Sequence, residues 1–485
     1  MFIYNSLSGK KEELKKPWWN RKLKLFVCGP TVYDDPHIGH ARTSISFDII
    51  AQFLRYEGFA LTYLQNITNV DDKIIARARE RNEDPFALAE RYEKSYLQTM
   101  KMLGVDSINR YARASDHIPE VITQVRTLIQ KGYAYRIEGE GYYFDITKFK
   151  DYGKLSKRTA LQAEDAMSRI DEGIQKRNRG DFCLWKFVKV DEPENTSLSY
   201  LLVHGEPAWN SSVGWGRPGW HIEDTAITEK YFGPQYDIHG GGLDLKFPHH
   251  EAEIAQQEAA SEKKPFVRYW MHAGSLIIGG EKMSKSKNNF ITMNEVFMKN
   301  GNDTETTKNI IRMLVASHHY RSPINFSWEL FEQARMRIQS LTELFAKLEF
   351  VKKKNGKGIQ KNTDGRADGN NMENEFMNAM RDDFNTPLAL GSIFSEFNRI
   401  APNIFSLNEH DANSVIHTLQ KCLSLLGITI PSHPIPEEIE KKAMERELSR
   451  SNKQFAHADT LRKEIETVGY EIEDTPLGPL VKKLK

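Results

Sequence analysis

The chain has 485 residues, 39% of them hydrophobic and 27% charged, which allows three or four domains and is typical of a soluble protein. Its formal net charge of +1 excludes a general nucleic-acid binder, so any RNA contact must use local patches. No apolar run is long enough to cross a bilayer, the N-terminus lacks the core of a secretory signal, and there are only three cysteines, so we expect a cytoplasmic protein.

The first predicted unit, residues 1–115, alternates strands and helices, as in a parallel α/β sheet that binds ligands at the carboxyl ends of its strands. Apolar residues alternate from Leu23 to Val27 and predict a strand, which Gly29-Pro30 ends. The spacing then becomes helical, and a strand that leads into a helix N-terminus forms an anion site. His37 and His40 lie at this point and can donate to phosphate oxygens, although histidines near a turn are more often surface residues.

Residues 116–210 are predicted to be an insertion that splits the sheet domain. A helix is expected over 116–131, followed by aromatic strands and a polar stretch around 160–180. The sheet pattern resumes in residues 211–300, with a strand, a helix from His249 and an extended chain that leads into the loop GGEKMSKSKNNF.

Residues 301–430 are predicted to form a helical bundle. The segment 351–371 is rich in lysine, asparagine and glycine and is predicted to be a mobile loop, and prolines at 431–436 mark a linker. Residues 437–485 are predicted to hold one long charged helix and then a short mixed region. The expected helices of the bundle are 304–318, 327–350, 372–400 and 409–425.

Two short motifs far apart in the chain indicate a nucleotide-dependent reaction. Residues 37–40 spell HIGH, and residues 282–286 spell KMSKS, about 245 residues later. A basic loop is usually only solvated charge, but two lysines three apart on a loop can close on a triphosphate. In this order the pair resembles the signature of class I aminoacyl-tRNA synthetases, and either motif alone would be a weaker signal.

A metal site is also suggested by residue spacing. His249 and Glu253 are four apart and share one face of the predicted helix, although such a pair is more often a surface pair. Cys28 can add a thiolate, although a lone buried cysteine is usually a packing residue. A set with few cysteines fits a catalytic zinc that keeps one position open better than a closed structural zinc.

Over essentially its whole length the chain resembles the cysteinyl-tRNA synthetase family. The matching stretches are CGPTVYDDPHIGHART, NITNVDDKI, KRNRGDFCLWK, GRPGWHIED, YDIHGGGLDLKFPHHEAEIAQ, EKMSKSKNNF, DDFNTPLAL and ADTLRKEIETVGYEIEDTPLG. The resemblance implies a split Rossmann-type catalytic domain with an inserted connective domain, a helical bundle and a small anticodon-binding domain at 437–485. It implies ligation of L-cysteine to tRNA-Cys through a cysteinyl adenylate, with Mg²⁺ bound to the ATP substrate, by a monomer that needs no membrane.

The resemblance further implies one zinc ion per chain that binds the thiolate of the substrate. The implied ligands are Cys28, Asp224, His249 and Glu253, where Asp224 replaces a cysteine that is usual in the family. An aspartate can ligate zinc; the alternative is that Asp224 only supports another ligand and the metal is weak or absent. Zinc prefers a soft thiolate to a hydroxyl, whereas a pocket alone separates such similar substrates only about 10- to 200-fold, so no separate editing domain is expected.

Other roles follow from the same resemblance. His37, His40, Lys282 and Lys285 would bind the ATP phosphates and stabilise the transition state. The backbone of Gly240, Gly241 and Gly242 would approach the adenosine, with Asp244 near the ribose or base. Besides Cys28 and Gly29, the amino-acid pocket would include Thr68, Trp220 and, nearby, His239, although Trp220 can equally be core and Asp244 a helix cap.

The chain departs from the family at two further places. Asn288 stands where a glycine is common, and asparagine tolerates the left-handed backbone that glycine favours. The C-terminus lacks the tryptophan that often follows the DTPLG-like segment, so anticodon contacts are assigned to Lys482 and Lys483. Two rival functions stay open: a ligase that joins cysteine to an amino sugar, and a non-catalytic paralogue that binds tRNA or a nucleotide.

Overall fold

The computed structural model describes residues 1–16, 22–158, 175–190, 200–283, 289–355, 369–430 and 434–483. The chain packs into two units. Unit 1 comprises Met1–Lys308, His318–Ser327 and Asp382–Phe384, and unit 2 comprises Asn309–Ser317, Trp328–Arg381 and Asn385–Lys485. Among the described residues, no helix combines the length and the apolar character needed to cross a membrane.

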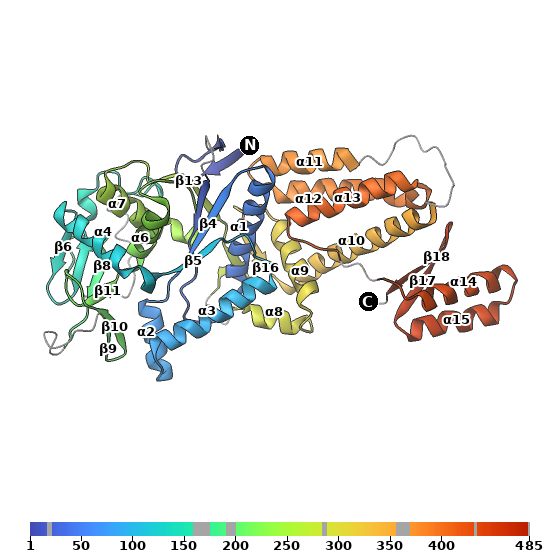
Figure 1. The fold of residues 1–485 in the computed structure, drawn as a ribbon, viewed down its shortest axis with the longest axis horizontal. Helices are drawn as coiled ribbons and strands as arrows, with labels where there is room; N and C mark the ends of the chain where they lie inside the picture. The colour runs from blue at the N-terminus through green and yellow to red at the C-terminus, as the bar shows by residue number, and fades with distance from the viewer. Residues whose placement is uncertain are drawn as a thin grey trace. The chain divides into compact units, whose positions relative to one another are not determined.

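A five-stranded parallel sheet lies at the centre of unit 1, as the alternation of strands and helices predicts (Figure 1). Strands β3 and β12 are neighbours although they come from opposite sides of the predicted insertion. The order of connections reverses between them, and ligands bind at the carboxyl ends of strands at such a point. The order is β13 (Val267–Ala273), β12 (Tyr236–Gly242), β3 (Leu23–Val27), β4 (Leu61–Ile67) and β5 (Arg110–Arg113).

Helix α1 (Ile38–Tyr56) packs on this sheet and begins at the HIGH motif. The apolar spacing that predicts this helix runs through Ile45, Ile49, Phe53 and Tyr56. The first three are on its buried face, whereas Tyr56 is 42% exposed at its last turn. Among the described residues, unit 1 contains the 3-10 turns η1 (Ala114–His117), η2 (Ile146–Lys148) and η6 (Leu243–Lys246). An N-terminal hairpin pairs β1 (Phe2–Asn5) with β2 (Lys10–Glu13). The other α-helices described wholly within unit 1 are α2 (Asp72–Arg81), α3 (Pro85–Met102), α4 (Ile118–Gln130), α6 (Trp220–Phe232), α7 (His249–Ser261) and α8 (Met293–Lys299).

An antiparallel sheet occupies much of the predicted insertion. Arg217, buried in this sheet, pairs with Glu206 at 2.8 Å and with Asp72 of α2, and so ties the sheet to α2. The sheet continues past residue 210 to Pro218, and residues 159–174 of the predicted polar stretch lie outside the described residues. Its strands follow the order β6 (Ala134–Ile137), β7 (Gly141–Phe144), β8 (Phe182–Phe187), β11 (Gly216–Pro218), β10 (Glu206–Trp209) and β9 (Tyr200–Val203).

A small sheet holds the chain before and after the KMSKS segment. Strand β14 (Leu276–Ile278) pairs in parallel with β16 (Ile324–Phe326) and antiparallel with β15 (Glu281–Lys282). The backbone after the segment contacts the start of α1, because Ile38 N–H donates to Ile291 O at 3.1 Å. The described chain therefore leaves the small sheet before residue 284 and contacts the HIGH turn after residue 288; residues 284–288 are outside the described part of the chain.

Unit 2 is helical, as the apolar spacing from residue 301 onward predicts. Helices α11 and α12 pack together, as do α10 and α13, and a separate group pairs α14 and α15 with a C-terminal hairpin. The elements of this part are α9 (Thr304–Ala316), which begins in unit 1, α10 (Trp328–Asn355), α11 (Gly369–Arg381), α12 (Thr386–Ile400), η8 (Ala401–Ser406), α13 (Glu409–Leu425), α14 (Glu437–Ser451), α15 (Phe455–Thr467), β17 (Tyr470–Thr475) and β18 (Gly478–Lys483).

Two predictions about these helices are wrong. The expected single helix over 372–400 is broken between α11 and α12, because Asp383 and Phe384 have φ values of 62° and 51° and Asn385 caps a new helix through Leu388 N–H. The expected single helix after residue 437 is two helices followed by a hairpin. Of the predicted loop 351–371, residues 356–368 lie outside the described residues, and the flanking residues are helical.

Candidate active site

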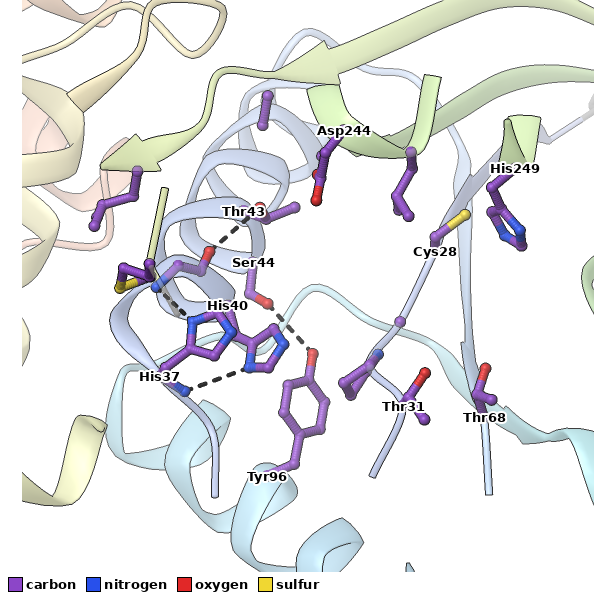
Figure 2. Close-up of a pocket in the computed structure, with 18 of the residues that line it drawn as sticks. Cys28, Thr31, His37, His40, Thr43, Ser44, Thr68, Tyr96, Asp244 and His249 are labelled. Carbon is purple, nitrogen blue, oxygen red and sulfur yellow. Dashed lines mark hydrogen bonds between the residues drawn. The ribbon is translucent and has the colours of Figure 1, made fainter. Parts of the chain in front are cut away.

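A cavity of about 640 Å³ opens at the carboxyl ends of β3 and β4 in unit 1. Figure 2 shows His37 and His40 toward one side of it and Cys28, Thr68 and His249 toward the other. The residues that sequence reasoning assigned to the site and that line the cavity are Cys28, Gly29, His37, His40, Thr68, Trp220, Asp224, Gly242, Asp244 and His249. The structure thus brings together side chains from strands and helices that are far apart in the sequence.

The four residues expected to bind zinc converge beside this cavity. Cys28 follows β3, Asp224 lies on α6, and His249 and Glu253 lie one turn apart on α7. His249 Nε2 is 3.0 Å from Asp224 Oδ2 and 2.9 Å from Glu253 Oε1. Cys28 Sγ is 3.4 Å from Asp224 Oδ2, and one ligand atom from each residue lies within 4.8 Å of the others. This is a thiolate, imidazole and carboxylate set of the kind that zinc accepts.

A second group shares two members with the first. Cys28, His239, His250 and Glu253 also offer ligand atoms within 4.8 Å of one another, and the two imidazole Nε2 atoms lie 3.3 and 3.2 Å from Cys28 Sγ. Sequence reasoning assigned His249 but missed His250. The histidine doublet was the available signal, and it was not sufficient because adjacent helical residues normally point in different directions. Here α7 is buried on all sides from His249 to Ala260, so neighbouring residues both reach the interior.

Further side chains orient the imidazoles of the second group. Tyr236 OH lies 2.6 Å from His239 Nδ1, and His250 Nδ1 lies 2.9 Å from His272 Nε2. Such outer contacts fix the ring orientation of a ligating histidine and raise its basicity. On the side of the first group, the ring of Trp220 stacks on His249 with the centroids 4.4 Å apart.

The electrostatics of the first group favour a bound cation. Burial and the neighbouring carboxylates of Asp224 and Glu253 raise the pKa of the Cys28 thiol well above its usual value. Burial also raises the pKa of Glu253, although His249 opposes the shift. Asp224 Oδ1 and Glu253 Oε2 are buried without a hydrogen-bond partner. A divalent cation would satisfy these oxygens and stabilise the charged forms, so the residues fit the implied metal.

The HIGH motif forms a defined pair of donors at the N-terminus of α1. His37 Nδ1 accepts from Gly39 N–H at 3.0 Å, and His40 Nδ1 accepts from His37 N–H at 3.4 Å (Figure 2). The rings stack with centroids 3.8 Å apart. Because both Nδ1 atoms accept, the neutral rings carry hydrogen on Nε2. Burial lowers the pKa of His40 to about 4, so this ring is a neutral donor at physiological pH.

The remaining predicted site residues lie at various distances from the cavity. Thr68 Oγ1 donates to the buried Glu223 carboxylate. His239 is fully buried in β12 and lies against Cys28 rather than on the cavity wall. A Cβ on Gly240 would lie 2.4 Å from the Phe47 ring, and one on Gly241 would lie 2.8 Å from the His250 ring. Close packing therefore explains these two glycines, and Gly242 is the one that lines the cavity.

The two lysines of KMSKS are described only in part. Lys282 belongs to β15, but its side chain and all of Lys285 lie outside the described residues. Met283 and Phe290, before and after this segment in the sequence, line the cavity. The rings of Phe290 and His37 make a T-shaped contact with their centroids 5.0 Å apart. Other lining residues that sequence reasoning missed are Tyr33, Gln65, Asn66, Lys73 and Tyr96.

Comparison with known proteins identifies the family. Residues 14–336 match the family described as tRNA synthetases class I (C) catalytic domain, and residues 375–430 match the DALR domain. A cysteine–tRNA ligase of Francisella philomiragia subsp. philomiragia is 41% identical over 494 aligned positions, covering 100% of both chains. The chain belongs to the cysteine–tRNA ligase family. The enzyme of Francisella tularensis subsp. mediasiatica is 40% identical, again over 100% of both chains.

Solved structures with low identity confirm the fold of this cysteine–tRNA ligase family member. Mycobacterium tuberculosis methionyl-tRNA synthetase, in complex with methionyl-adenylate, has a TM-score of 0.57 at 16% identity and covers 84% of this chain and 90% of its own. The LeuRS–tRNA–LeuAMS complex of Agrobacterium radiobacter K84 has a TM-score of 0.59 at 11% identity, with 97% of each chain covered. The predicted α/β class I fold with a helical region is therefore confirmed.

Proposed function

We propose that this protein activates L-cysteine with Mg-ATP and transfers it to tRNA-Cys. The observation that carries the proposal is that one cavity joins the donor set around Cys28 to the imidazoles of His37 and His40. In the first step the cysteine carboxylate attacks the α-phosphorus of ATP, and pyrophosphate leaves. In the second step a ribose hydroxyl of the terminal adenosine of tRNA attacks the activated carbonyl, and AMP leaves.

The proposed zinc ion, one per chain, would be held by Cys28, Asp224, His249 and Glu253. Bound there it would supply a soft Lewis acid that prefers the substrate thiolate to the hydroxyl of serine. Three of these residues line the cavity, so a substrate side chain in the cavity reaches the cluster directly. Trp220 stacks on His249, and Thr68 lines the cavity on the same side as Cys28 (Figure 2). We assign both to the amino-acid pocket.

The activation chemistry is assigned to the HIGH turn and the KMSKS segment. His37 and His40 present Nε2–H donors, and a neutral donor keeps its proton while charge develops on the phosphate oxygens. Lys282 and Lys285 would neutralise the departing pyrophosphate. Asp244 lines the cavity on η6, at the end of β12, and is assigned to the ribose or base of ATP together with the backbone from Gly240 to Gly242.

We assign functions to domains with the boundaries predicted from the sequence. Residues 1–115 and 211–300 would form the catalytic domain and 116–210 the connective insertion, whose sheet extends to Pro218. Residues 301–430, which include the matched DALR domain, and 437–485 would bind tRNA. We also propose that the protein acts as a monomer in the cytoplasm. Light scattering at micromolar concentration checks the first of these proposals, and cell fractionation checks the second.

The test of the proposed function is ATP–pyrophosphate exchange with cysteine or serine, followed by charging of tRNA-Cys. Exchange should depend on cysteine, and charging should release one AMP per cysteinyl-tRNA. Exchange without tRNA charging, but with a thiol-bearing amide formed from an amino sugar, would instead support the amino-sugar ligase. The absence of any exchange on metal-loaded protein would favour the non-catalytic paralogue.

The C-terminal group of α14, α15 and the hairpin exposes the aromatic side chain of Phe455. Lys482 Nζ pairs with Glu473 at 2.7 Å and with Glu471 at 3.5 Å, so part of its charge is already compensated. Phe455, the first residue of α15, is 61% exposed. Unstacked RNA bases bind aromatic side chains, so we assign to Phe455 the stacking that the missing C-terminal tryptophan would have provided.

Phe455→Ala should raise the KM for tRNA-Cys without changing cysteine-dependent exchange. Loss of one base–aromatic stack costs about 1–3 kcal/mol, which corresponds to about a 5- to 150-fold rise. Leu448→Ala is the matched control, because Leu448 is 62% exposed on the adjacent α14 and has no ring. Steady-state charging kinetics with varied tRNA measure the effect. An equal KM for both variants would remove Phe455 from the anticodon contact.

A further inference from the structure

A three-residue segment of the chain is packed unlike its neighbours. Asp382–Phe384 belongs to unit 1, whereas α11 before it and α12 after it belong to unit 2. Asp383 and Phe384 both have left-handed backbone conformations, which non-glycine residues rarely adopt. Such conformations persist only where the surroundings enforce them, and they concentrate at functional sites. The segment is the start of the stretch DDFNTPLAL, to which the proposed function gives no role.

The Asp383 carboxylate is fully buried and accepts several hydrogen bonds. Its Oδ1 accepts from Tyr4 N–H at 2.7 Å and from Tyr320 OH at 2.9 Å. Its Oδ2 accepts from Arg321 Nε at 2.8 Å, and its backbone N–H donates to Phe2 O at 2.9 Å. Two of these donors belong to residues 319–322, so the carboxylate holds this segment in place.

The segment 319–322 in turn holds the helix that carries the HIGH motif. Arg42 lies on α1 two residues after His40 and is buried. Its Nη2 donates to three carbonyl oxygens of the segment: His319 O at 2.9 Å, Tyr320 O at 2.9 Å and Ser322 O at 3.3 Å. A shift of the segment would therefore move the acceptors of Arg42 and with them the first turns of α1.

The same segment holds the chain that leads into KMSKS. Gly274 N–H donates to Tyr320 O at 2.7 Å, and Ile324 N–H donates to Ser275 O at 3.0 Å. The contact is close, because a Cβ on Gly274 would lie 2.3 Å from Ser322 O. From there β14 pairs with β16 and with β15, which contains Lys282. Residues 319–322 thus form hydrogen bonds both to α1, which begins at the HIGH motif, and to the chain that leads into KMSKS.

We propose that Asp383 is a positioning residue for the activation step. It fixes residues 319–322, and these set the distance between the HIGH turn and β15, the strand that contains Lys282 of KMSKS. In the proposed function, the groups that stabilise the transition state come from the HIGH turn and from KMSKS. The distance between these two elements must therefore be held to a fraction of an ångström. The turn between α11 and α12 is then required for the chemistry of unit 1. This inference rests on the proposed function.

The test compares Asp383→Asn with Asp382→Asn in the full-length protein. Asparagine keeps the size of Asp383 but places an amide NH₂ opposite a donor, whereas Asp382 is 52% exposed and forms a surface pair with Lys11. A misplacement of about 1 Å can cost about 100-fold, so Asp383→Asn should lower kcat of cysteine-dependent exchange about 10- to 100-fold. The KM for cysteine and the zinc content should stay unchanged, since the Asp383 carboxylate bonds to Tyr4, Tyr320 and Arg321 and not to the Cys28 cluster. Asp382→Asn should match the wild type.

Two further variants separate positioning from stability. Arg321→Gln added to Asp383→Asn offers an acceptor to the new amide, and it should restore part of kcat. Tyr320→Phe removes one donor and keeps the ring, so if Asp383→Asn does not fold, a lowered kcat of Tyr320→Phe at an unchanged melting temperature supports the proposal. A wild-type kcat per folded molecule in Asp383→Asn, or in Tyr320→Phe, would overturn it. If the wild type itself shows no cysteine-dependent exchange, the proposed function fails first.

Discussion

Asp224→Ala is expected to remove the bound metal and, with it, most of the preference for cysteine over serine. Asp224 Oδ2 lies 3.0 Å from His249 Nε2 and 3.4 Å from Cys28 Sγ, and its other oxygen is buried without a partner. Loss of this carboxylate leaves three ligands, one of them a thiol whose pKa burial has raised. The remaining pocket would separate cysteine from serine only about 10- to 200-fold, because the two side chains have nearly the same shape.

The measurement is metal content by mass spectrometry together with kcat/KM for cysteine- and serine-dependent exchange. Asp224→Cys restores the residue that is usual in the family and should keep both zinc and discrimination. Asp181→Ala is the matched control for burial: it removes a carboxylate that is 1% exposed and that accepts from Tyr135 OH and from the N–H groups of Ile146 and Asn178 rather than from the cluster. Asp181→Ala should lower the stability of the protein without changing the ratio of kcat/KM for cysteine to kcat/KM for serine.

The structure also provides a test between the two donor groups. Both contain Cys28 and Glu253, and they differ in having Asp224 with His249 or His239 with His250. If the first group binds zinc, Asp224→Ala loses the metal and His250→Gln retains it. If Asp224→Ala retains stoichiometric zinc and His250→Gln loses it, the second group is the site and Asp224 has a supporting role. Loss of the metal from one variant and not the other therefore assigns the ligands.

Local patterns predicted those parts of the site that depend on short-range geometry. The strand before Cys28, the helix after His37 and the shared helix face of His249 and Glu253 all follow from spacing within a few residues. The meeting of Asp224 with these residues depends on α6 packing against α7, and spacing within the sequence does not contain that information. The resemblance to a family supplied it instead.

The break between α11 and α12 shows a different limit. Residues 372–400 have the composition and apolar spacing of one helix, and Pro387 alone is compatible with the first turn of a helix. What ends α11 is a set of contacts with residues far away in the sequence: Tyr4, Tyr320 and Arg321 hold Asp383 in a left-handed conformation. Tertiary packing overrides local preference here, at the residue we infer to position the active site.

His40→Asn is expected to lower kcat of the activation step about 100- to 1,000-fold, which is the usual cost of removing one transition-state donor. His40 Nδ1 accepts the N–H of His37, and an asparagine side-chain oxygen can take over that contact and preserve the start of α1. It cannot reach as far as Nε2, so the donor to the phosphate is lost. His40→Gln has an amide nitrogen at about the position of Nε2 and should retain more activity than His40→Asn.

The pH dependence gives an independent check of the same residue. Burial lowers the pKa of His40 to about 4, below the value near 6.5 expected in the unfolded chain. The folded protein therefore keeps this ring neutral down to about pH 4, and the required proton is on Nε2 throughout the range from pH 5 to pH 8. The measurement is the pH profile of kcat/KM for ATP in the exchange reaction, for the wild type and for His40→Gln. If the wild-type profile has an inflection near pH 6.5, the same inflection should be present in His40→Gln. An inflection that disappears in this variant would mean that His40 acts as an imidazolium ion, and the neutral-donor role would be wrong.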